Sequence, residues 1–227
     1  MGNGDAGSAG RRFDRLRRVM RDRPVRALLL IVGSISLFVP MASIGEVFLA
    51  REVLRTSAFG FTTLGTAFTA GTVAGTLLAP RVCRRETAAV MGSLMLTLTG
   101  VSIAIVGMAG TLQLALVPYT LAGLAFGVQT TATRSIIQPY VATQVRPDDR
   151  AYVFSVYVAV GMGSQLAAFL CGATVIQLLG ARPVMWLAGG GAALAGLLGY
   201  LRRSVWAGPA GQDLADATAD PDPRVSA

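Results

Sequence analysis

The 227-residue sequence contains no His and no Lys, has only two Cys, and has 14% charged residues. Without His, the commonest general base and a frequent zinc ligand are both missing. Cys83 lies in a basic loop and Cys171 in an apolar run far from it, so we expect neither a disulfide nor a shared metal ion. Soluble proteins have about 25% charged residues, so the low charge content argues against an ordinary soluble enzyme.

Hydrophobic residues make up 53% of the chain, and six apolar stretches are long enough to cross a bilayer, which takes about 20 residues in a helix. We expect an all-α membrane protein with six transmembrane helices. The expected spans are Ala27–Leu49, Phe59–Ala79, Ala88–Met108, Leu112–Thr133, Val153–Leu178 and Val184–Leu201.

The expected organisation is one six-span membrane bundle, residues 25–203, between two polar segments. Residues 1–24 form an Arg-rich cytoplasmic segment, either a linker or a short basic helix lying on the inner leaflet. Residues 204–227 are expected to be a disordered acidic cytoplasmic tail. The first apolar run exceeds the 7–15 residues, roughly, of a signal-peptide core, so we expect no cleavage there.

The distribution of Arg predicts the orientation. With both termini cytoplasmic, seventeen of the twenty Arg lie inside and three lie outside, which fits the positive-inside rule. The formal net charge of +8 therefore marks membrane boundaries, and we expect a multi-pass protein of the cell membrane with the lipid bilayer, not nucleic acid, as its partner.

Small residues recur on two of the expected helices. Ala67, Gly71 and Gly75 repeat every four residues on one helix, and Gly161, Gln165 and Gly172 form a related stripe on another. Such stripes let backbones approach closely and predict a tightly packed helix partner, in this chain or in another.

Polar residues line the first and fourth expected helices, which predicts a water-accessible cavity shared by the two. Hydrogen bonding between helices is the alternative explanation. The candidate cavity-lining residues are Ser36, Ser43, Glu46, Thr120, Gln129, Thr130 and Arg134.

Glu46 and Arg134 are the ionisable residues close to the hydrocarbon. Glu46 follows Arg26 by twenty residues, or roughly 30 Å of helix, which puts it near the outer boundary. We expect both side chains to reach for the interface, with a role in substrate or proton handling as the alternative.

No nucleophile and base share a span, and neither G-x-S-x-G nor a P-loop pattern occurs, so we expect no enzyme activity and no cofactor.

Several segments, in this order, resemble the C-terminal half of a major facilitator superfamily transporter of the bacterial drug and siderophore exporter branch. The segments are Arg23–Arg26, Glu46–Leu49 with Arg51–Ala58, Arg134–Pro139 leading on to Gly161, and Leu179–Arg182.

The resemblance implies half of a twelve-helix fold, built as a 3+3 inverted repeat. It makes the first and fourth helices line the cavity, and it makes the stripes of the second and fifth helices, Ala67, Gly71, Gly75, Gly161, Gln165 and Gly172, pack half against half. It also implies export of a small, partly apolar molecule, driven by protons, together with a second six-span bundle: a separate N-terminal half or another copy. The alternative is a truncated or accessory membrane protein that transports nothing.

Overall fold

The computed structural model of the chain describes residues 23–83, 87–144 and 147–201. In this part of the chain six long α-helices and one π-helix form, and there is no strand. The helices are α2 (Arg23–Phe48), the π-helix η1 (Leu49–Val53), α3 (Ala58–Val82), α4 (Ala88–Met108), α5 (Leu112–Gln144), α6 (Pro147–Leu179) and α7 (Ala181–Leu201). The all-α fold is thus confirmed, while the expected terminal segments fall almost entirely outside the described residues.

Five segments are long and apolar enough to cross a membrane: Val32–Val53, Ala88–Met108, Leu112–Gln138, Arg150–Leu179 and Ala181–Leu201. Helix α3 is not among them, although its 25 residues are sufficient in length. Its many Thr and Gly residues lower its mean hydropathy. A helix of this composition is suited to contact protein or water better than lipid.

Several helix boundaries differ from the expected spans. Helix α4 has the expected bounds, whereas α5 continues past Thr133 to Gln144 and α6 begins at Pro147, ahead of Val153. Both extensions carry charged and polar residues, so the apolar runs end before the helices do. The expected loop after Leu49 begins instead with η1, closed by a 2.9 Å hydrogen bond from the Leu54 amide to the Leu49 carbonyl.

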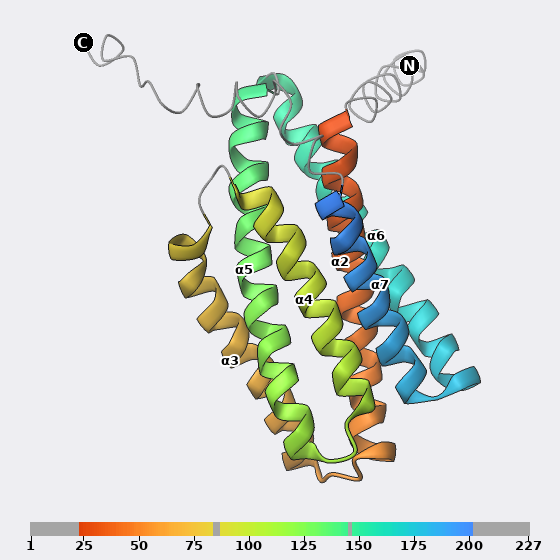
Figure 1. Cartoon of the computed structure of the whole chain (residues 1–227). Coiled ribbons are helices and arrows are strands. Elements are labelled where there is room, and N and C mark those ends of the chain that lie inside the picture. The colour runs from red at the N-terminus through yellow and green to blue at the C-terminus, as the bar shows by residue number, and fades with distance from the viewer. Residues whose placement is uncertain (1–22, 84–86, 145–146, 202–227) are drawn as a thin grey trace, which may run out of the picture.

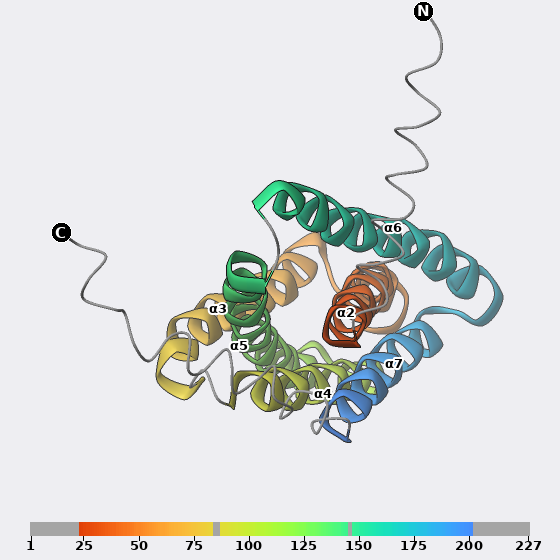
Figure 2. The same cartoon turned by 90° about the horizontal axis from the view of Figure 1, so that it is seen from above.

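Consecutive long helices run in opposite directions, and α2 begins at the same end of the bundle where α7 ends (Figure 1). Seen from above, α6 forms one margin of the bundle, and α2 lies between α6 and α7 (Figure 2). Helix α5 lies between α3 and α4, with which it packs (Figure 2).

The packing follows a two-fold pattern. Exchanging α2 with α5, α3 with α6 and α4 with α7 turns the α3–α5 contact into α6–α2, and the α4–α5 contact into α7–α2, while α4–α7 maps onto itself. These are the extensive interfaces between the described helices. Helices α2 and α5 run in opposite directions (Figure 1), so the pattern is that of a 3+3 inverted repeat.

The closest backbone contacts join α3 to α5. A Cβ on Gly71 would overlap the carbonyl oxygen of Thr120, and one on Gly75 would overlap that of Leu124. The contact is reciprocal, because a Cβ on Gly123 or Gly127 of α5 would in turn overlap a carbonyl of α3. The small-residue stripe of α3 therefore finds its partner inside this chain.

A second close interface joins α4 to α7. A Cβ on Gly100 would overlap the backbone of Gly189 and Ala193, and one on Gly196 would lie 2.5 Å from the amide nitrogen of Thr97. Gly189 and Gly196 of α7 are therefore packing positions. In a membrane, where lipid tails remove most of the hydrophobic incentive for helices to meet, such close approach supplies the packing energy.

We expect Gly75→Ala to destabilise the bundle by about 1–3 kcal/mol, because its methyl group would overlap the Leu124 backbone and force α3 away from α5. The matched control is Gly163→Ala, since no atom lies within 4 Å of the position its Cβ would take. It should leave stability unchanged or raise it by up to about 1 kcal/mol through helix propensity. Unfolding of the purified protein in mixed micelles measures both; equal stability of the two variants would contradict this packing.

Candidate functional site

Glu46 is buried inside the bundle. It lies on α2 near the η1 end, and only 8% of its surface is exposed. Its Oε2 accepts a 2.5 Å hydrogen bond from the hydroxyl of Tyr119 on α5. The expectation that this side chain reaches for the membrane interface is therefore wrong: the helix turns it inward, toward α5.

The other carboxyl oxygen, Oε1, is also buried and has no hydrogen-bond partner. A Cβ placed on Gly65 of α3 would lie 4.0 Å from this oxygen, so Oε1 is directed to the place where α3 lacks a side chain. A buried carboxyl group with an open acceptor is costly to keep and is most often functional when it lies in a membrane helix.

Tyr119 is held in place by aromatic packing. Its ring centroid lies 5.1 Å from that of Phe68 on α3, and the Phe68 ring lies 5.8 Å from that of Phe126. Aromatic rings that are tilted relative to each other at such centroid distances attract each other. Sequence reasoning missed Tyr119, although it directly precedes Thr120 on the polar stripe of its helix.

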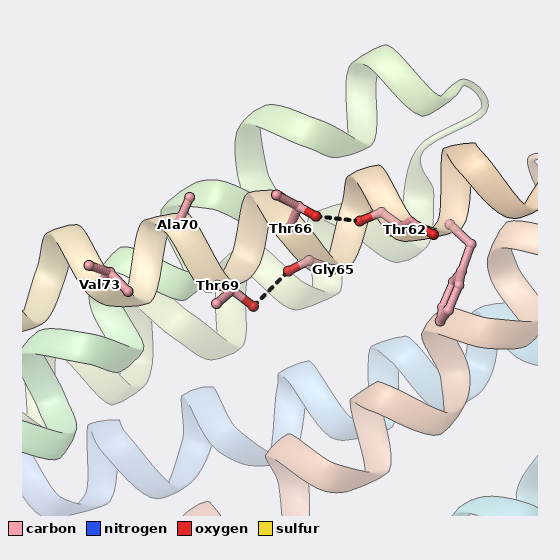
Figure 3. Close-up of a pocket in the computed structure, with 7 residues that line it drawn as sticks. Thr62, Gly65, Thr66, Thr69, Ala70 and Val73 are labelled. Carbon is pink, nitrogen blue, oxygen red and sulfur yellow. Dashed lines mark hydrogen bonds between the residues drawn. The ribbon is translucent and has the colours of Figure 1, made fainter.

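A groove of about 590 Å³ runs along the face of α3 next to Gly65 (Figure 3). It is lined by Phe61, Thr62, Gly65, Thr66, Thr69, Ala70 and Val73. The groove is open along the surface rather than enclosed. Its residues recur every three or four positions, which places them on one side of the helix.

The Thr hydroxyls of the groove bond to their own helix. Thr62, Thr66 and Thr69 each donate to the carbonyl four residues earlier, at 2.8–2.9 Å. Two of these bonds are drawn in Figure 3. Each hydroxyl oxygen keeps lone pairs that can accept a further bond, so the groove offers a weakly polar surface.

The candidate cavity residues have different surroundings in the structure. Ser36 faces α6, because a Cβ on Gly161 would lie 3.5 Å from its Oγ. Gln129 is buried and donates from Nε2 to Thr133 at 3.1 Å, while its own Oε1 has no partner. Ser43, Thr120 and Thr130 bond to carbonyls of their own helices, and Arg134 is exposed. Of the seven, the structure places Glu46 beside the groove of α3.

The residues expected to pack half against half also divide. Gly71 and Gly75 are covered by α5, and Gly172 is covered by Ile44 of α2, so these three pack within the chain. Gln165 is exposed on α6, and Ala67 is half-buried. The surface of α3 that stays open is its Thr-lined groove rather than its Gly stripe.

Comparison with protein families gives one result. The family model described as MFS/sugar transport protein, where MFS stands for the major facilitator superfamily, matches residues 4–184. Neither curated proteins nor solved structures give a match.

We expect Tyr119→Phe to destabilise the protein by about 2 kcal/mol, because it leaves both oxygens of the buried Glu46 carboxyl group without a donor. In a Glu46→Leu background the same substitution should cost little, since no acceptor remains. The double-mutant cycle, measured by unfolding in micelles, should give a coupling energy of roughly 1.5–3 kcal/mol. Additive effects of the two substitutions would show that the hydrogen bond contributes nothing.

Proposed function

The chain belongs to the MFS/sugar transport protein family, a family of membrane transporters and not of enzymes, and we propose that it acts as one half of a secondary transporter. A second six-helix bundle, a separately encoded half or another copy of this chain, completes the cavity. The two bundles rock against each other around a small-molecule substrate held between them.

The contrast between the open faces of the helices carries this proposal. The exposed large side chains of α4 are Leu94, Val101, Ile105 and Met108, all suited to lipid. Helix α7 likewise exposes Trp186 and several Leu residues. Helix α3 also exposes apolar side chains, among them Phe61, Val73 and Leu77. Its open face differs because it adds Thr62, Thr66 and Thr69, with a groove and a buried carboxyl group beside them. A face of this kind is better matched to protein, water or substrate than to hydrocarbon.

The groove also supports a substrate class. Its lining combines the Phe61 ring and the Val73 side chain with Thr hydroxyls, and it presents no charged residue. This mixture suits a small, partly apolar molecule with one or two hydrogen-bonding groups. In line with the exporter branch that the sequence resembles, we propose export across the cell membrane.

Purification from the native membrane in mild detergent, with the mass and composition of the complex determined, tests the second bundle. Co-purification of a second six-helix chain in equal amount, or a dimer of this chain, is the expected result. A monomer in every mild detergent would overturn the half-transporter proposal and favour an accessory protein.

A cross-linking experiment locates the contact. With Cys83→Ser and Cys171→Ser as background, Thr69→Cys should cross-link to the second bundle in native membranes, because Thr69 lies on the open face of α3. Ile105→Cys is the matched control, since Ile105 is exposed on the apolar face of α4. Cross-links at Ile105 and none at Thr69 would place the partner against α4 and contradict the proposed contact at α3.

Labelling of Cys83 tests the proposed cytoplasmic termini. Cys83 caps α3 at the end of the bundle opposite η1, and an impermeant maleimide should reach it in inside-out vesicles and not in right-side-out vesicles. Thr56→Cys, in the connection between η1 and α3, should label from the other side. Burial raises the pKa of the Cys83 thiol, so the thiolate is scarce near neutral pH and labelling should speed up as pH rises. Cys83 labelling in right-side-out vesicles would reverse the orientation.

A further inference from the structure

The buried carboxyl group of Glu46 lacks a fixed counter-charge. Among the described residues no Arg lies within ion-pair distance of it, and its only hydrogen-bond donor is the Tyr119 hydroxyl. An ionised carboxylate in such surroundings is strongly destabilised unless it gains a cation or a proton. The site is therefore suited to bind a proton or another cation reversibly.

Among the described residues, Tyr119 is the one titratable group shown in contact with Glu46. Helix α6, which packs on α2, carries Cys171 next to Gly172, and Cys171 is exposed. Helix α5 contributes Tyr119, and the charged residue of α3, Arg81, lies at the opposite end of that helix. At the η1 end, Arg51, Glu52, Arg55 and Arg182 are all exposed. Whether Glu46 is charged therefore depends on the proton or cation that reaches its free oxygen, Oε1.

That oxygen is separated from the groove by Gly65. Gly65 lines the groove, and the place of its missing Cβ is 4.0 Å from Oε1. No side chain of α3 stands between the two at this position. A Val at position 65 would fill the gap between the groove and Oε1.

We propose that Oε1 of Glu46 is a proton-exchange site, reached from the α3 groove across Gly65. On protonation the carboxylate takes a proton from groove water onto Oε1, and Tyr119 continues to donate to Oε2. On deprotonation the proton returns to groove water by the same route. The role of this exchange in driving transport rests on the function proposed above; the exchange itself requires this chain alone.

A proton fits the site better than a metal ion. Na⁺, Mg²⁺ and Ca²⁺ need several converging oxygen ligands, about six to eight in the case of Ca²⁺. The free side of Glu46 offers one oxygen facing a glycine, and the described residues contain no group of three or more potential metal-ligating side chains.

Carbodiimide labelling of the purified chain in detergent tests the proposal. Dicyclohexylcarbodiimide is an apolar reagent that adds to protonated carboxylic acids, and mass spectrometry identifies the modified residue. Glu46 should be labelled, and the extent should fall as the pH is raised. A water-soluble carbodiimide should instead label Glu52, which is exposed in η1, and leave Glu46 unmodified.

Two variants test the route across Gly65. Gly65→Val should slow labelling of Glu46 roughly tenfold, which corresponds to a barrier higher by about 1.4 kcal/mol. Thr76→Val, a nearly isosteric change at an exposed Thr of α3 that does not line the groove, should label at the wild-type rate. Gly65→Ala, whose methyl group would be in ordinary contact with Oε1, gives a smaller decrease and serves if the Val variant does not fold, as judged by its thermal unfolding.

Three results would overturn the proposal: no labelling of Glu46 at any pH, labelling that does not change with pH, or wild-type labelling of both Gly65 variants. Suppression of labelling by NaCl but not by choline chloride at the same ionic strength would show a metal-cation site instead. Because no second bundle takes part, failure here leaves the half-transporter proposal standing, and a monomeric chain leaves the proton site standing.

Discussion

The backbone contact between α3 and α5 is the constraint on which the rest of the bundle depends. Gly71 and Gly75 of one helix and Gly123 and Gly127 of the other let the two backbones touch, with no room for a methyl group between them. In lipid, where apolar surfaces gain little by meeting, this closeness is the main source of attraction between helices. It fixes the height and rotation of α3 on α5, and with them the positions of every side chain that the two helices carry.

The candidate site follows from that contact step by step. The carbonyl of Phe68 touches Gly123, so the Phe68 ring is set against Tyr119 of the neighbouring turn. Tyr119 is in this way directed to Glu46 of α2, and Gly65, one turn before Phe68, faces the remaining carboxyl oxygen. A buried carboxyl group is tolerated at this point because its donor is held by packing and not by a flexible loop.

Much of this fold could be predicted from the sequence, because a membrane helix must be long and apolar whatever surrounds it. The stripe of α3 likewise predicted a close helix partner, but small residues do not specify which helix they meet; the structure shows that it is α5. Glu46 was misplaced for a related reason. The rise per residue gives a position along the membrane normal, while burial depends on rotation about the helix axis and on the neighbours. Tyr119 was missed because one Tyr in an apolar run is indistinguishable from a packing residue until its partner is known.

The two-fold related interface, α2 against α6, is packed less closely. Where α3 and α5 meet backbone to backbone, the glycines between α2 and α6 meet side chains. A Cβ on Gly33 would lie 3.4 Å from Oγ of Ser164, and one on Gly161 would lie 3.5 Å from Oγ of Ser36. The tightest of these contacts, at Gly172, is with the end of the Ile44 side chain at 2.9 Å. We therefore expect unequal freedom in the two equivalent interfaces. Backbone contact locks α3 on α5, whereas the side chains between α2 and α6 can change rotamer. The hydrogen bond from Tyr119 to Glu46 links the two interfaces, because it joins α2 to α5, on which α3 is locked. Any displacement of α2 relative to α5 must break or lengthen that bond, so the energy of moving α2 depends on what occupies the carboxyl group of Glu46.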